Sequence, residues 1–182
     1  MRTSSVIGAA FVMWVAVVFF AGVAPAAQQK PIAPFTGEYK PPPAPEQPIP
    51  YSHKTHLSQG LECVMCHDTA ETDDLATIPP TSTCMGCHDN VKTDSPHIQK
   101  LKGWDDKKES VPWHRVYRLP DYVYFSHTQH VIHGKVTCDA CHGNVPQLDA
   151  MQKMKDISMA ACIECHKSRA ASNLCDSCHD TL

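Results

Sequence analysis

The sequence lacks an excess of charge of either sign. Its 16 Lys and Arg residues nearly balance 19 Asp and Glu residues, which gives a formal net charge of −3 at pH 7. Domains that bind nucleic acid usually present a basic surface, so this balance gives binding to DNA or RNA no electrostatic support. The length of 182 residues predicts one domain or two small ones. A chain this short buries little apolar surface of its own.

No cysteine stands outside a repeated unit. All ten belong to five Cys-x-x-Cys-His units, which are Cys63, Cys66 and His67; Cys84, Cys87 and His88; Cys138, Cys141 and His142; Cys162, Cys165 and His166; and Cys175, Cys178 and His179. Zinc sites, redox disulfides and iron–sulfur clusters do not need a histidine after every pair. Cys-x-x-Cys-His is instead the attachment signature of c-type haem, in which both thiols bond the haem and the histidine binds its iron. The pattern predicts five covalently bound c-type haems.

Histidines outside the motifs are candidates for the second axial ligand of each iron. Seven are available: His53, His56, His97, His114, His127, His130 and His133. Four of them form two His-x-x-His pairs, and residues at i and i+3 project from nearly the same side of a helical turn. Each pair is therefore predicted to serve two neighbouring haems. The fifth distal ligand is left among His97, His114 and His133, and His114 is preferred because aromatic residues flank it.

An internal repeat gives the predicted architecture. YSHKTHLSQGLECVMCH (51–67) and FSHTQHVIHGKVTCDACH (125–142) both read aromatic-Ser-His-x-x-His, then Gly, then the haem motif, at a period of about 75 residues. A second haem motif comes later in each copy. We expect a dihaem module at 51–90, a connector at 91–124, and a dihaem module with a terminal haem at 125–182.

The fold class depends on the haem content. Since the haems must supply most of the core, we expect a mostly irregular, haem-cored chain with short α-helices around the motifs and almost no β-sheet. Without haem the chain should be largely unfolded, as small metal-dependent domains are without their metal.

No charged residue interrupts the apolar run at 6–23, and no cysteine comes after the small residues that end it. Residues 1–27 are predicted to be either a cleaved signal peptide or an N-terminal membrane anchor, and a lipoprotein anchor is not expected. Eight prolines in 31–50 predict an extended, Pro-rich linker over 28–50. In either case the haem domain at 51–182 is exported, to the periplasmic side of the membrane.

Several stretches carry a family resemblance. The His-x-x-His ahead of a haem motif resembles the class III multihaem cytochromes of the c3 and c7 type. More specifically, PEQPIPYSHKTH, TCMGCHDNVKTDSPHIQKLK, VPWHRVYRLPDYVYFSHTQHV and ISMAACIECHK resemble the pentahaem cytochrome c subunit of alternative complex III, a bacterial menaquinol-oxidising complex. A related subunit occurs in the menaquinone reductase complex. Relatives often carry His where this chain has Tyr117.

The resemblance implies ligand pairs and partners. The first histidine of each pair would serve the haem of the next motif along the chain, so that His53 pairs with His67 and His127 with His142. His56 and His130 would each serve a neighbouring haem. The implied function is electron transfer on the periplasmic side, with other subunits of a membrane respiratory complex as redox partners.

Two alternatives are typically marked by residues that this sequence lacks. A multihaem nitrite reductase typically replaces one motif histidine with lysine, and a tetrahaem-type quinol dehydrogenase has a methionine close after its first motif. All five motifs here keep histidine, and CHDTAETDD contains no methionine. A stand-alone carrier of the c3 or c7 type and a membrane-anchored quinol dehydrogenase stay open as alternatives, and a multihaem reductase is the least favoured. We predict an electron carrier with no catalytic residue and no small-molecule substrate site.

The matured protein should carry five haems, because five intact motifs use all ten cysteines. Intact-mass spectrometry of the protein produced with c-type maturation measures this directly. A mass that corresponds to four haems or fewer would refute the prediction.

Overall fold

The computed structural model describes residues 38–180. The predicted signal peptide or anchor at 1–27 lies outside the described residues, as does the first part of the predicted linker. All described residues belong to a single compact unit. None of its helices is both long and apolar enough to span a bilayer.

Every Cys-x-x-Cys-His unit folds as a helical turn or lies within a short helix. Three units lie in α2 (Thr81–His88), α4 (Cys138–His142) and α5 (Met159–Ser168), and the other two begin the 3-10 turns η1 (Cys63–Met65) and η5 (Cys175–Ser177). In the two shortest turns, the backbone N–H of His67 donates to Cys63 O at 2.8 Å and that of His179 to Cys175 O at 3.0 Å. One helical turn brings residues i, i+3 and i+4 to the same side, as attachment of both thiols and ligation by the histidine require.

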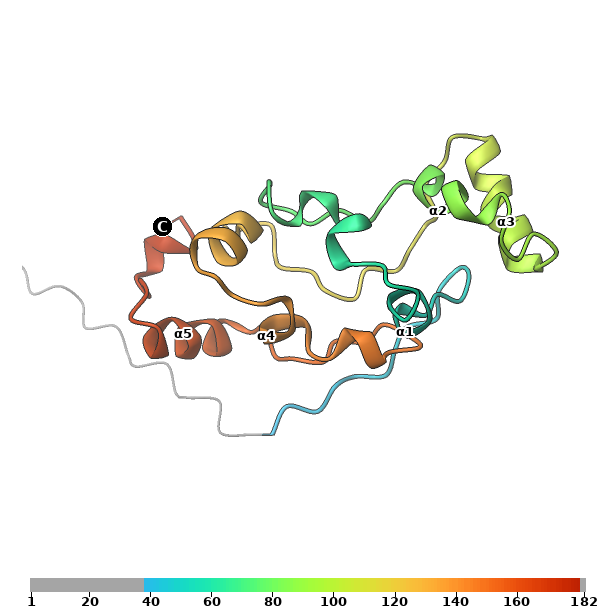
Figure 1. Ribbon diagram of the computed structural model, residues 1–182. Helices are drawn as coiled ribbons and strands as arrows, with labels where there is room; N and C mark the ends of the chain where they lie inside the picture. The colour runs from blue at the N-terminus through green and yellow to red at the C-terminus, as the bar shows by residue number, and fades with distance from the viewer. Residues whose placement is uncertain (1–37, 181–182) are drawn as a thin grey trace, which may run out of the picture. The chain divides into compact units, whose positions relative to one another are not determined.

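The remaining elements are also short. They are α1 (His53–Leu57), α3 (Pro96–Asp106), the 3-10 turns η2 (Asp68–Ala70) and η4 (Val145–Gln147), and the π-helical turn η3 (Gln129–His133). Long irregular segments join them, and residues 38–180 contain no β-strand (Figure 1). The predicted fold class is confirmed.

The two His-x-x-His segments begin with the same serine cap. The Ser52 hydroxyl accepts from the backbone N–H of Thr55 at 3.0 Å, and the Ser126 hydroxyl accepts from that of Gln129 at 3.2 Å. The second segment then widens into η3, where Gly134 N donates to Gln129 O at 2.8 Å. A Cβ on Gly134 would lie 2.8 Å from His130 O, so this tight turn requires glycine.

A small apolar core joins α2 to α3. Ile49, Met85, Leu101 and Val111 are the buried apolar side chains of the described residues, and Trp104 and Trp113 pack against them. Four side chains are few for a chain of this length, so most of the described unit is held by other means. The connector therefore contributes one helix, α3, which packs against α2 of the first module.

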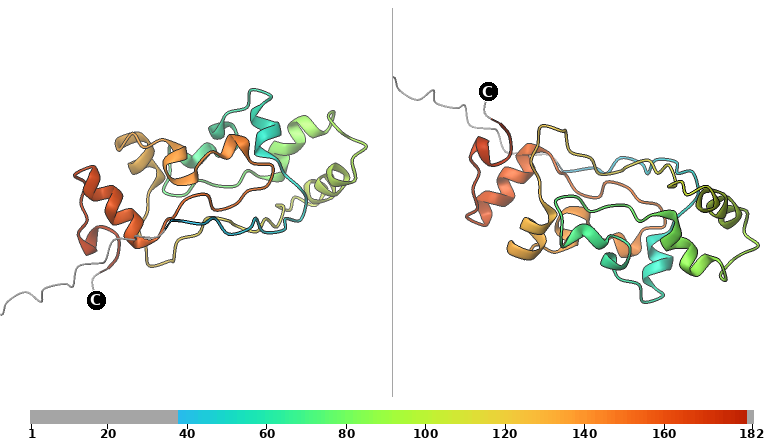
Figure 2. Two further views of the ribbon diagram at one scale, coloured as in Figure 1. Left: turned by 90° about the horizontal axis from the view of Figure 1, so that it is seen from below. Right: turned by 90° about the horizontal axis from the view of Figure 1, so that it is seen from above.

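The described part of the predicted linker, 38–50, packs against the haem domain. The Tyr39 hydroxyl donates to Lys153 O at 3.0 Å, the Lys100 ammonium donates to Pro48 O at 2.8 Å, and Ile49 is buried. Figure 2 shows this extended segment, in blue, beside the connector in both views. These contacts make residues 38–50 part of the folded unit.

Leu101→Ala should destabilise the holoprotein by about 2–4 kcal/mol, because Leu101 is 2% exposed at the centre of the α2–α3 core. Lys102→Ala on the same helix is the matched control, since its ion pair with Asp106 is exposed to solvent and contributes little to stability. Urea unfolding monitored by far-UV circular dichroism compares the two variants. Equal midpoints for both would contradict the assignment of this core.

Candidate haem-binding sites

None of the ten motif cysteines forms a disulfide, and all are exposed or half-buried. Burial raises the pKa of the Cys84 and Cys141 thiols above the usual value. No disulfide consumes a motif cysteine, so all ten sulfurs are available for thioether bonds.

Three pairs of imidazole rings face one another across a gap. The ring centroids are 6.1 Å apart for His56 and His88, 6.5 Å for His127 and His142, and 6.0 Å for His130 and His166. Two imidazoles that share one metal ion, each bonded at about 2.0–2.1 Å, have centroids roughly 6 Å apart. These separations fit an iron between each pair.

His53 lies near the motif histidine His67. Burial, followed by the neighbouring rings of His67 and His56, lowers the pKa of His53 to about 4. The ring is therefore neutral at pH 7, which is the protonation state that binds a metal. Burial and the nearby His127 likewise lower the pKa of His142.

An aromatic ring positions both imidazoles of each His-x-x-His pair. Tyr51 stacks on His56 at 4.4 Å and meets His53 edge-on at 4.9 Å. Phe125 repeats both contacts, with His130 at 4.5 Å and His127 at 4.8 Å. The sequence pattern contains this aromatic residue in both copies, but no role was predicted for it. Its fixed position two residues before the first histidine is the feature that could have indicated one.

Backbone carbonyls fix the tautomer of most of these rings. The Nδ1–H of His56 donates to Ser52 O at 2.8 Å, and that of His130 donates to Ser126 O at 2.7 Å. Other Nδ1 atoms bond Thr77 O (from His67), Val91 O (from His88) and Ser172 O (from His166). The Nδ1 of His127 lies 2.9 Å from Asp74 O and 3.2 Å from the backbone N of Ala76, so these contacts do not fix its tautomer. A proton held on Nδ1 leaves the Nε2 lone pair for a metal. In the described unit, the Nδ1 atoms of His53 and His179 are buried without a hydrogen-bond partner.

The fifth motif histidine differs from the other four. Its ring contacts that of Tyr122, with centroids 6.1 Å apart and planes at 44°, and no imidazole of residues 38–180 lies against it. His97 in α3 and His133 in η3 do not contact a motif ring among the described residues. The structure therefore brings three imidazole pairs face to face, places His53 near His67, and leaves His179 facing a phenol.

His114, the preferred fifth distal ligand, is not brought opposite a motif histidine. Its Nδ1–H donates to Glu46 O at 2.6 Å, and its backbone N–H donates to the Gln47 side chain at 2.9 Å. These bonds hold the exposed ring on the 38–50 segment. The structure therefore gives no support to His114 as the fifth distal ligand. Local sequence could not predict that Glu46 and Gln47 pack against this histidine.

Tyr117, where relatives often carry histidine, lies beside the third site. Its ring is 4.4 Å from that of His142, and its hydroxyl accepts from Met154 N at 2.9 Å. It buttresses a motif histidine and does not face a ring across an iron-sized gap.

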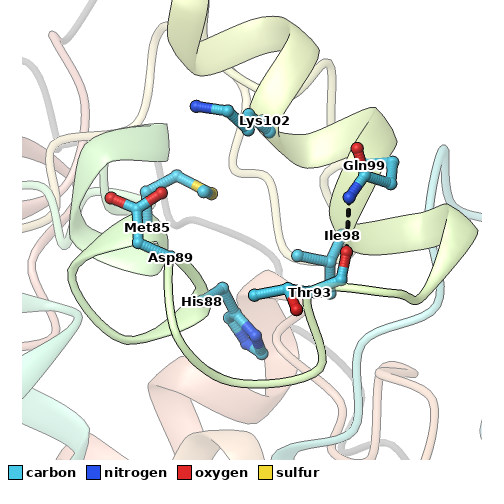
Figure 3. Close-up of a pocket in the computed structure, with 7 residues that line it drawn as sticks. All are labelled: Met85, His88, Asp89, Thr93, Ile98, Gln99 and Lys102. Atoms are coloured by element: carbon cyan, nitrogen blue, oxygen red, sulfur yellow. Dashed lines mark hydrogen bonds between the residues drawn. The ribbon is translucent and has the colours of Figure 1, made fainter.

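A pocket lies beside His88, between the end of α2 and α3. Met85, His88 and Asp89 line it on one side, and Ile98, Gln99 and Lys102 line it on the other (Figure 3). Within residues 38–180, no group of three or more His, Cys, Asp or Glu side chains is arranged so that it could hold a metal ion by itself. Paired thiols outside any disulfide and imidazoles that face one another across iron-sized gaps together fit c-type haem.

Comparison with known proteins agrees with this chemistry. A family model described as cytochrome c7 and related cytochrome c matches residues 123–180. The chain is 30% identical over 164 residues to the multihaem cytochrome c subunit of menaquinone reductase from Nitratidesulfovibrio vulgaris, covering 74% of this chain and 77% of that protein. It is 40% identical over 57 residues to cytochrome c3 from Desulfuromonas acetoxidans, covering 31% of this chain and 79% of that protein. The matched relative belongs to a menaquinone reductase, whereas the sequence resemblance pointed first to alternative complex III.

His56→Ala should convert one ferric haem from low-spin to high-spin and leave every covalent attachment intact, because the ring facing His88 at 6.1 Å is lost. His97→Ala is the matched control and should leave the spin states unchanged. Electron paramagnetic resonance quantifies the high-spin iron, and mass spectrometry confirms haem content. High-spin iron in His97→Ala but not in His56→Ala would show that the pairing is wrong.

Proposed function

The chain belongs to the multihaem c-type cytochromes of the c3 and c7 family, an electron-transfer family, and from that premise we propose that it relays electrons through five haems as a subunit of a menaquinone-linked membrane complex. The relay would lie on the periplasmic side. Its redox partners would be other subunits of the same complex.

The observation that carries the proposal is the pair of His-x-x-His segments, each of which presents imidazoles to two motif histidines. His56 faces His88 at 6.1 Å and His130 faces His166 at 6.0 Å. Haem, when bound, supplies reversible one-electron chemistry. The chain would contribute thioether attachment, facing imidazoles at three sites, a further imidazole near His67, and fixed spacing between neighbouring sites. With an imidazole on each side, such an iron would have no open position for a substrate, which favours relay over bond chemistry.

Membership of a respiratory complex is supported by the extent of the similarity. The menaquinone reductase subunit matches over 164 residues, 74% of this chain, which is more than one repeat module can account for. The apolar run at 6–23 supports export, either as a soluble protein after cleavage or as an anchored one. A stand-alone carrier is the second candidate, because cytochrome c3 of Desulfuromonas acetoxidans is covered over 79% of its own length.

The test is affinity purification of the tagged full chain from membranes in mild detergent. Under the proposal, other membrane subunits co-purify, and a water-soluble menaquinol analogue changes the haem α-band in the purified complex. If menaquinone analogue oxidises the pre-reduced haems faster than menaquinol reduces the oxidised ones, the complex is a reductase. Recovery of the cytochrome alone, with no response to either analogue, would overturn complex membership and favour the stand-alone carrier.

A further inference from the structure

The five haem motifs are not arranged in space in the order in which they occur in the sequence. The sites are numbered here by chain order, from the first (Cys63, Cys66 and His67) to the fifth (Cys175, Cys178 and His179). Three kinds of contact fix which sites are neighbours: the shared His-x-x-His segments, backbone bonds between the two modules, and contacts between motif thiols.

Within each module the His-x-x-His segment joins two sites. In the first module, His53 lies with His67 of the first site while His56, one turn on, faces His88 of the second. In the second module, His127 faces His142 of the third site, and His130 faces His166 of the fourth. The first and second sites are therefore adjacent, as are the third and fourth.

Between the modules, the loop after the first motif holds the second His-x-x-His segment. Asp74 O accepts from the backbone N–H of His127 at 3.1 Å, and the ring Nδ1 of His127 lies 2.9 Å from Asp74 O and 3.2 Å from the backbone N of Ala76. Asp73 O accepts from the backbone N–H of Thr128 at 3.3 Å and from its hydroxyl at 3.0 Å. The first site is thereby fixed to the histidine that faces the third.

The loop after the third motif returns the same contact. Leu148 O accepts from the backbone N–H of Lys54 in α1 at 3.0 Å, and the Asp149 carboxylate accepts from the Ser52 hydroxyl at 2.9 Å. A salt bridge of 3.8 Å joins Lys54 to Asp149. In each module, the loop after the first haem motif is thus hydrogen-bonded to the His-x-x-His segment of the other module.

The thiols agree with this reciprocal arrangement. The Cys138 thiol of the third site lies near the Cys63 thiol of the first, which adds to burial in raising the pKa of Cys138. Beyond the fourth site, Cys162 interacts with Cys178, and Cys178 O accepts from the backbone N–H of Tyr124 at 2.8 Å. The fifth site therefore continues from the fourth. The α2–α3 hairpin at the second site and η5 at the fifth lie at opposite ends of the described unit in every view (Figures 1 and 2).

We propose that the relay runs in the spatial order second, first, third, fourth, fifth, and that electrons cross between the modules from the first site to the third. This inference rests on the proposed relay function. The second site, beside α2 and α3, and the fifth site, at η5, are then the two ends at which donor and acceptor meet the chain.

Nuclear Overhauser spectroscopy of the fully reduced, diamagnetic holoprotein tests this order, because cross-peaks arise between substituents of adjacent haems. Four variants identify the haems, since each removes one distal imidazole and alters the signals of one haem: His53→Ala, His56→Ala, His127→Ala and His130→Ala. In the wild type, the haem identified by His53→Ala should show cross-peaks to the haem identified by His127→Ala. The haem identified by His56→Ala should show none to that of His127→Ala.

Cross-peaks between the second and third haems, with none between the first and third, would overturn the proposal. Where an alanine variant does not fold, His→Met at the same position keeps a ligand and still shifts the signals of one haem. The test is independent of quinone chemistry: loss of complex membership leaves the cross-peaks intact, and a mass short of five haems refutes the relay before their order is measured.

Discussion

The pairing of facing imidazoles is the constraint on which the rest of the structure depends. His56 and His88 are 32 residues apart in the chain, and His130 and His166 are 36 apart, yet their rings lie 6.1 Å and 6.0 Å from each other. Four buried apolar side chains cannot hold 143 described residues in place. Under the proposed function, iron bound between the rings ties together segments that the polypeptide alone leaves far apart. Metal binding and folding are then one process.

The repeat explains the symmetry of the assembly and its departures from symmetry. In both copies, an aromatic ring, a serine cap and a carbonyl that accepts from Nδ1 orient the two imidazoles. Each copy is also hydrogen-bonded to the other, through Leu148 O or Asp74 O. Three features have no counterpart in the other copy: α3, the 38–50 segment and the fifth motif. α3 and the fifth motif lie at the two ends of the inferred relay, whereas the 38–50 segment runs from Lys153, after the third motif, to α3. Selection for different partners at the two ends would place additions there and leave the junction between modules unchanged.

Spacing within the sequence predicted most of the site and the fold class. The haem motifs, the duplication and the short helices all result from local patterns, because a helical turn fixes the relation between residues three and four apart. The ligand partners of His56 and His130 were left open, since they depend on contacts between distant segments. The position of the His114 ring could not be predicted for the same reason, because the carbonyl of Glu46 that accepts from this ring is 68 residues away. Tyr122, which lies against His179, carried no signal of its own.

The central claim is that haem ligation, and not a buried apolar core, holds the fold together. The amide spectrum of a haem-free chain tests this claim most directly. Replacing all ten cysteines by alanine prevents covalent attachment and leaves the four buried core residues unchanged. Two-dimensional nitrogen–proton spectra of this variant and of the reduced holoprotein should differ sharply. The holoprotein should give dispersed amide signals, and the variant should give signals collapsed into the narrow range of an unfolded chain. A dispersed, native-like spectrum of the haem-free variant would show that the polypeptide holds this fold by itself, and would contradict the account.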